Sequence, residues 1–209
     1  MPDAPSNERC THNQPQKGRL AGQKPPLKPQ EVWSIRVLLK IHGKTRDLAL
    51  FDLAIDSKLR CCDLVALRVS DISQNGRIKH RAVVIQQKTG RPVQFEITEQ
   101  TRQAVMVWMT VNSLQNRDYL FQSRVRNSIH LSTRQYARIV DGWVESIGLD
   151  SRKYGTHSMR RTKAALIYKK TGNLRAIQLL LGHSKLESTV RYLGVELDDA
   201  LTISEQIDL

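Results

Sequence analysis

The sequence predicts a mainly α-helical chain with one small antiparallel β-sheet, which is an α+β fold class. From residue 28 onward, most segments carry apolar residues at the spacing of three or four that amphipathic helices require. One stretch instead contains two β-branched runs separated by a glycine turn, the pattern of a β-hairpin. The 209 residues contain no internal repeat and are enough for one sizeable domain with a real core.

The N-terminal segment, 1–29, is rich in proline, glutamine and lysine and has almost no large apolar residues. Such a composition buries too little surface to offset its ordering entropy, so we expect disorder there. The first helix is expected over 28–43 and ends at a glycine. A second helix is expected over 45–60, where Thr45 can cap its start, and a shorter one over 61–72.

The hairpin is expected from strands at 81–87 and 92–98, joined by the turn "KTGR". Helical patterns return after it, over 98–112, 132–147, 155–171, 173–181, 185–193 and 197–207. The final stretch, 196–209, contains five acidic residues and no basic one. We therefore expect an acidic C-terminal tail helix that does not lie on a polyanion.

The overall charge is strongly positive. Lys and Arg number 33 against 20 Asp and Glu, which gives a formal charge of +13 and a pI of about 10.0. This excess predicts a polyanionic partner, with nucleic acid as the default, although a merely basic surface is the alternative. Cys10, Cys61 and Cys62 form neither a disulfide framework nor a metal-binding pair. With no stretch of about 18 apolar residues and no signal-peptide core, a cytoplasmic protein is expected.

Two short motifs place polar groups at helix ends. His157 and Arg160 lie at i and i+3 near the start of the helix after Gly155, so they share a face beside N–H groups that favour anions. His183 follows Gly182, which suits a left-handed helix C-cap, and so projects from a tight turn. The alternative interpretations are an ordinary surface pair and an exposed turn histidine.

Three further residues are weak candidates for a functional site when taken singly and become informative only together. Arg60 stands at a helix start three residues before Asp63, where a weak surface ion pair is the plain alternative. Lys88 occupies the hairpin turn, and Tyr192 lies near the end of a short helix, where packing is its usual role. The segment "HGKT" at 42–45 is no phosphate-binding loop, because Leu38 stands where that motif requires glycine.

The order and spacing of these motifs resemble the tyrosine recombinase (phage integrase) family. The matching segments are "LRCCDLVALRVSDI", "QQKTGR", "HSMR" and "LGHS", followed by Tyr192 nine residues after His183. The resemblance covers about residues 30–195. The chain departs from the family in "DSKLR", where Thr-Gly often precedes the first arginine, and at Cys62–Asp63, where Ser–Glu is commoner. Family members also usually carry a helical core-binding domain ahead of the catalytic domain, and none is recognisable here.

The resemblance implies a metal-free and cofactor-free transesterification on double-stranded DNA. Tyr192 would attack phosphorus and form a 3′-phosphotyrosine, while Arg60 and Arg160 clamp the phosphate oxygens. Lys88 would protonate the leaving 5′-oxygen. His157 would accept the tyrosine proton, and His183 would hydrogen-bond a phosphate oxygen.

The implied organisation is a disordered segment at 1–29, a catalytic domain at 30–195 and the acidic tail at 196–209. The implied activity is that of an integrase-like site-specific recombinase that exchanges strands within a homotetramer on DNA. The tail would dock either on a neighbouring subunit or back on its own domain. Two competing functions remain: a DNA-binding module or regulator without productive strand exchange, and a topoisomerase-like enzyme that relaxes DNA.

Overall fold

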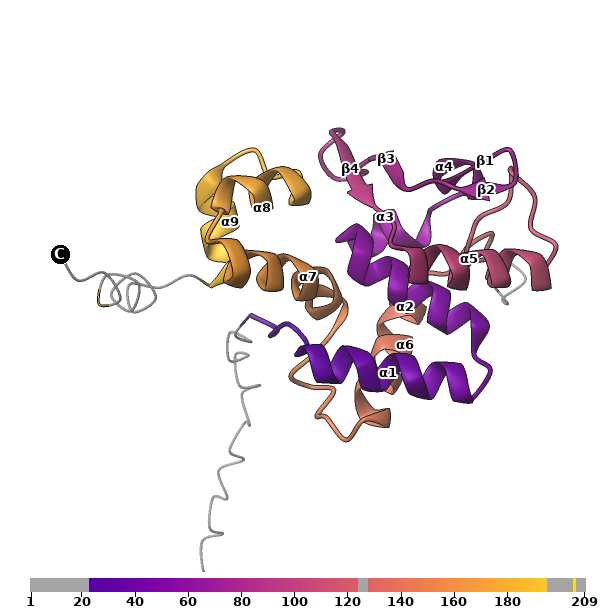
Figure 1. Ribbon diagram of the computed structural model, residues 1–209, viewed down its shortest axis with the longest axis horizontal. Coiled ribbons are helices and arrows are strands. Elements are labelled where there is room, and N and C mark those ends of the chain that lie inside the picture. Colours follow the sequence, from indigo (N-terminus) through magenta and orange to yellow (C-terminus); the bar gives the residue numbers. More distant parts are fainter. Residues whose placement is uncertain (1–22, 124–127, 195–204, 206–209) are drawn as a thin grey trace, which may run out of the picture.

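The fold is mainly helical with antiparallel β-structure, which confirms the predicted fold class, although the described residues form two small sheets where one was expected. The computed structural model describes residues 23–123 and 128–194, together with residue 205. Its elements are α1 (Pro29–Ile41), α2 (Thr45–Ser57), α3 (Cys61–Val65), α4 (Val69–Ile72), β1 (Ser73–Gln74), β2 (Arg77–Ile78), β3 (Arg81–Ile85), β4 (Pro92–Glu96), α5 (Glu99–Val111), α6 (Thr133–Ser146), α7 (Thr156–Thr171), α8 (Leu174–Leu181) and α9 (Leu186–Leu193). Figure 1 shows α7, α8 and α9 gathered on one side of the other elements, with α8 facing β4.

Helix α2 is the centre of the main core. Every residue from Ala49 to Ser57 is buried, because α1, α5 and α7 all pack against this helix. Phe51 projects from it and meets the Trp143 ring of α6 edge to face, with ring centroids 5.3 Å apart. Helices α7–α9 enclose a second, much smaller cluster around Ala164, Ile177 and Leu181.

The prediction of a single helix over 61–72 is wrong, because two short helices, α3 and α4, occupy this segment. The backbone between α3 and α4 pairs with residues 118–120 and does not continue the helix. The Leu120 N–H donates to the Leu67 carbonyl at 2.8 Å, and Val69 N–H donates to the Asp118 carbonyl at 3.0 Å. Tertiary hydrogen bonds therefore override the local helical pattern.

The sheet region also differs in detail from the expectation. Strands β3 and β4 pair antiparallel, but each ends two residues earlier than expected, at Ile85 and Glu96. The Gln86 carbonyl already accepts the turn N–H of Gly90 at 2.8 Å, which ends the first strand. The extra β1–β2 pair was not expected, although its Asn75-Gly76 turn, with φ of 51° and 73°, is a recognised hairpin signal.

The N-terminal boundary lies earlier than expected. Residues 23–28 are placed against the domain, Leu27 is buried, and the Leu27 N–H donates to Thr162 Oγ1 at 3.0 Å. Burial of Leu27 and hydrogen bonds to α7 and α9 together anchor this polar segment. The remainder of the segment expected to be disordered, 1–22, and the tail helix expected at 197–207 lie outside the described residues, apart from residue 205. No helix in the described part is both long and apolar enough to cross a membrane.

A partly buried ion network joins α2, β4 and α7. Lys163 Nζ lies 2.7 Å from Asp56 Oδ1 and 2.6 Å from Glu96 Oε1. Lys58 Nζ lies 3.0 Å from the same Glu96 oxygen, and its side chain is fully buried. The second Asp56 oxygen accepts hydrogen bonds from the hydroxyls of two threonines at the start of α5. The network therefore satisfies its charges with groups from α2, β4, α5 and α7.

The network lowers the pKa of both carboxyls. Burial alone would raise the pKa of Asp56, but hydrogen bonds from Lys163 and two threonines outweigh burial. At Glu96, burial alone would also raise the pKa. The positive charge of Lys58 and a hydrogen bond from Lys163 outweigh burial, so the pKa of Glu96 is lowered. In the folded protein, the pKa values of both carboxyls lie below the unfolded value of about 4. The stabilisation by the network is therefore complete above about pH 4 and is lost as the pH falls through the folded-state pKa values.

Replacing Lys163 tests this network. In Lys163→Met, the free energy of unfolding at pH 7 should fall by about 3 kcal/mol, because a buried carboxylate loses its partner. The loss of stability on acidification should also become shallower, because the carboxyl pKa values rise toward those of the unfolded chain. Urea unfolding at a series of pH values measures both. Lys169→Met, at an exposed position of the same helix, is the control, and equal stability of the two variants would contradict the network.

Gly182 ends α8 in the expected left-handed conformation, with φ of +67°. A Cβ atom at this position would overlap Val93 Cγ2 of β4. Gly182→Ala should therefore cost more than the ~1 kcal/mol of left-handed strain, because a steric term adds to it. Gly172→Ala is the matched control, since Gly172 has φ of +63° and open space around it. Thermal melting of both variants isolates the steric contribution, and equal melting temperatures would show that β4 does not constrain this turn.

Candidate active site

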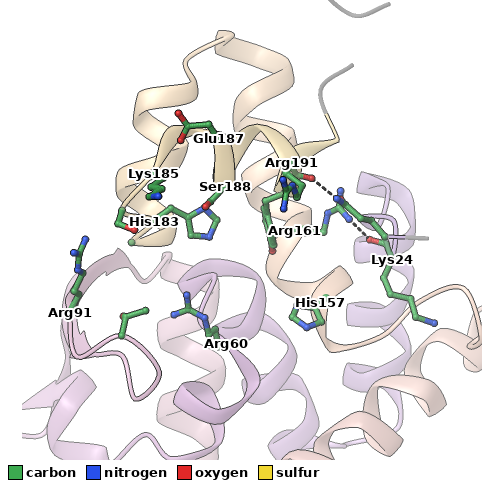
Figure 2. A pocket seen from close by; sticks show the side chains of 15 residues that line it. Lys24, Arg60, Arg91, His157, Arg161, His183, Lys185, Glu187, Ser188 and Arg191 are labelled. Carbon is green, nitrogen blue, oxygen red and sulfur yellow. Dashed lines mark hydrogen bonds between the residues drawn. The ribbon is translucent and has the colours of Figure 1, made fainter. Parts of the chain in front are cut away.

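The candidate site is a cleft of about 770 Å³ between α9, the β3–β4 turn and the start of α3. Four of the expected residues line it: Arg60, His157, His183 and Tyr192. Its other cationic lining residues are Lys24, Arg91, Arg161, Lys185 and Arg191, against the single carboxylate of Glu187. Figure 2 shows these side chains arriving from several elements around one opening. A concave surface with this charge suits a polyanion.

Arg60 is held by the hairpin. It is the N-cap residue of α3, and its Nη1 donates to Oε1 of the buried Gln86 at 2.5 Å. The alternative ion pair with Asp63 is wrong, since the buried Asp63 carboxylate accepts the Gln87 N–H at 2.8 Å instead. Asp63 thus fastens the hairpin turn to α3, and the same contact brings the turn beside Arg60.

Arg160 is only 4% exposed, so the surface-pair interpretation is wrong for this residue. Its Nη2 donates to the Leu181 carbonyl at 2.9 Å, which ties α7 to the last turn of α8. Within the described residues its buried Nε has no hydrogen-bond partner. His157 lies one turn earlier, as the second residue of α7, and is exposed in the cleft wall. The helix therefore holds one rigid guanidinium and one accessible imidazole.

The Tyr192 side chain is enclosed by cations and an imidazole. The Arg160 Cζ lies 5.6 Å and the Arg161 Cζ 5.3 Å from the centroid of the tyrosine ring. The His183 ring meets it edge to face, with centroids 5.5 Å apart. The tyrosine hydroxyl is buried and has no hydrogen-bond partner among the described residues. A polar atom in this position is poised for a group brought from outside the chain.

Electrostatics sets the protonation state of each group. Burial raises the pKa of Tyr192 to about 12, although Arg160, Arg161 and Arg60 oppose it, so the phenol keeps its proton at neutral pH. Burial and the same arginines, together with Lys88, lower the pKa of His157. Attack by the phenol oxygen therefore needs a proton acceptor, and a neutral His157 has the right charge state for that role.

Lys88 stands apart from the other five expected residues. It is exposed in the β3–β4 turn and does not line the cleft, although its neighbours Thr89 and Arg91 do. Its charge nevertheless reaches the site, because it contributes to the lowered pKa of His157. The structure thus brings five of the residues together and leaves Lys88 at the rim.

Several residues of the site were not found from the sequence. Arg161 is buried, and its Nη1 donates to the Lys24 carbonyl at 2.9 Å. Gln23 Nε2 donates to the carbonyl of Arg191, the residue before Tyr192, so the N-terminal segment contacts both α7 and α9. The Arg-Arg doublet was the only available signal for Arg161. Among the described residues, no group of three or more His, Cys, Asp or Glu side chains could hold a metal ion.

Comparison with solved structures confirms the fold. XerA recombinase superposes with a TM-score of 0.71 at 20% identity, covering 88% of this chain and 65% of that one. XerH site-specific recombinase bound to its difH substrate gives 0.69 at 18% identity, covering 88% and 54%. At these identities the likeness concerns the fold alone, which is that of the tyrosine recombinase catalytic domain, as the sequence predicted.

Comparison with sequences identifies the family. The family model described as "Phage integrase family" matches residues 27–197. The probable integrase/recombinase YoeC of Bacillus subtilis (strain 168) is 31% identical over 158 residues, which are 76% of this chain and 82% of YoeC. The tyrosine recombinase XerC of Neisseria gonorrhoeae is 29% identical over 188 residues, 84% of this chain but 59% of that protein. The chain therefore belongs to the phage integrase family.

Proposed function

We propose that this chain is a site-specific DNA recombinase that cleaves and rejoins DNA through a 3′-phosphotyrosine. The observation that carries the proposal is the Tyr192 hydroxyl, which is buried and unpartnered among the described residues, beside two arginines and a histidine. A phosphodiester in the cleft would supply the anionic oxygens that this arrangement favours. The names of the relatives agree, since YoeC is a probable integrase/recombinase and XerC a tyrosine recombinase.

The proposed reaction is a transesterification. The Tyr192 oxygen attacks phosphorus, the bond from phosphorus to the 5′-oxygen breaks, and the number of phosphoester bonds is unchanged. His157 accepts the phenol proton, and Lys88 supplies a proton to the departing 5′-oxygen. Rejoining is the same step in reverse, with a 5′-hydroxyl as the attacking group.

The two arginines and His183 stabilise the negative charge on the phosphate oxygens. Arg60 and Arg160 present planar donors to the non-bridging oxygens, and both are fixed beforehand by hydrogen bonds to Gln86 and to the Leu181 carbonyl. Such preorganised charge is usually the largest single catalytic contribution. These groups carry out the chemistry without a metal or cofactor, which remains a prediction from the sequence.

Double-stranded DNA is the proposed partner, and assembly into a homotetramer on DNA is the proposed state. XerH and the Tn1549 transposon integrase were both solved with DNA. Leu179 on α8 and Leu186 on α9 are 62% and 42% exposed, and in the proposed tetramer they would be available to contact another subunit. The chain spans 59% of the length of XerC.

Removing one oxygen atom tests the nucleophile. In Tyr192→Phe, the covalent protein–DNA adduct on a nicked suicide substrate should disappear, while DNA binding changes little, because the ring and its packing remain. Denaturing gel electrophoresis measures the adduct, and a gel-shift titration measures binding. Tyr168→Phe is the matched control, because Tyr168 packs in the same small cluster but does not line the cleft.

Two outcomes would overturn parts of the proposal. An adduct of normal yield in Tyr192→Phe would show that another residue is the nucleophile. Tight binding of the intact chain to DNA without any adduct would favour the alternative of a DNA-binding module that lacks strand exchange. Adduct formation with relaxation of supercoiled DNA but no exchange between sites would favour the topoisomerase-like alternative.

Binding should depend steeply on salt. Six cationic side chains line the cleft, and six phosphate contacts correspond to a loss of affinity of roughly a thousandfold between about 50 and 200 mM salt. Lys185→Gln should reduce the slope of log affinity against log salt by about one, because one fewer counterion is released. Lys40→Gln, on α1 outside the cleft, is the control. A flat salt response in fluorescence anisotropy would exclude DNA as the ligand.

A further inference from the structure

We infer that Thr189 is a positioning residue that fixes the tautomer of His183, so that this histidine presents an N–H to the scissile phosphate. The inference rests on the proposed function for the identity of the phosphate. Its structural basis is one contact: Thr189 Oγ1 lies 3.1 Å from His183 Nδ1. Thr189 is fully buried on α9, one helical turn before Tyr192.

The direction of this hydrogen bond follows from counting donors and acceptors. Among residues 23–123 and 128–194, His183 Nδ1 is the only hydrogen-bond partner of the Thr189 hydroxyl. If Nδ1 carried the hydrogen and donated, the buried hydroxyl hydrogen would have no acceptor, which costs about 1–3 kcal/mol. The hydroxyl therefore donates to Nδ1. In a neutral imidazole, the hydrogen must then be on Nε2.

The neutral state of the ring is also set by its surroundings. Burial and the charges of Arg160 and Arg60 lower the pKa of His183 to about 4, so the ring is neutral at physiological pH. His183 lines the cleft, as Figure 2 shows, and its Nε2 has no partner among the described residues. With Nε2–H, the ring donates to an anionic phosphate oxygen. The other tautomer would present a lone pair and repel it.

The same helix carries the nucleophile and the residue that fixes the tautomer. Thr189 and Tyr192 are three residues apart and share one face of α9. Thr189 is also the only buried residue of this helix. Seating α9 therefore places the phenol and completes the Thr189–His183 contact together. A site without a seated tyrosine would lack both the attacking group and the enforced donor.

The test uses Thr189→Val, which keeps the shape but removes the hydroxyl, and Thr189→Ser, which restores it. Nitrogen-15 NMR of labelled imidazoles reads the tautomer in the free protein, and a His183→Gln spectrum assigns the signals among the six histidines. Wild type and Thr189→Ser should show hydrogen on Nε2, whereas Thr189→Val should show a mixture. Adduct formation on the suicide substrate should slow roughly tenfold in Thr189→Val, with unchanged DNA affinity and near-complete recovery in Thr189→Ser.

Each contrary outcome is decisive. Hydrogen on Nδ1 in the wild-type protein would overturn the inference whether or not any variant folds. Equal impairment of Thr189→Ser and Thr189→Val would show that the residue acts through packing alone, and an unchanged tautomer and rate in Thr189→Val would show no role. The NMR measurement needs no DNA, so absence of an adduct in wild type would refute the proposed function and leave the tautomer assignment standing.

Discussion

The partly buried ion network of Asp56, Lys58, Glu96 and Lys163 is the constraint on which the site depends. Lys58 precedes Arg60 by two residues, and Lys163 follows Arg160 by three, so one set of contacts fixes both ends from which the arginines project. A guanidinium can stabilise a transition state only if its position is set before the substrate arrives. Because the carboxylate of Asp56 and the ammonium of Lys58 are buried and need close partners, the network holds α2, β4 and α7 together and so keeps a fixed separation between Arg60 and Arg160.

A second contact extends this rigidity to the nucleophile. The Leu181 carbonyl at the end of α8 accepts from both Arg160 Nη2 and Gln86 Nε2. The last carbonyls of a helix have no partner within it, and the left-handed Gly182 turns the chain away so that these donors can reach. Helix α9, by contrast, buries only Thr189 and packs on a small cluster. Arg160 is therefore buried and Arg60 half-buried at tied positions, whereas the tyrosine lies on a short helix with one buried residue.

Local patterns predicted most of the helices, because an amphipathic helix is determined by residues only three or four positions apart. The expectation failed where distant backbone competed. Residues 67–69 pair with 118–120, and no local signal announces such a partner. The network was also invisible from the sequence, because charged residues such as Lys58 and Lys163 normally face solvent, and only contacts across four elements make their burial tolerable.

The sequence by itself identified the candidate reactive side chains, which are two histidines, two arginines and a tyrosine at the ends of helices. It also showed that the chain has a formal charge of +13. It could also place Gly182 as a left-handed cap, because backbone conformation depends on the residue itself. Only the tertiary structure decided that Asp63 anchors the hairpin, that Arg161 joins the site, that Lys88 stays at its rim and that Thr189 contacts His183. Burial and hydrogen-bond direction are properties of neighbours in space, and these neighbours are brought together only when the chain folds.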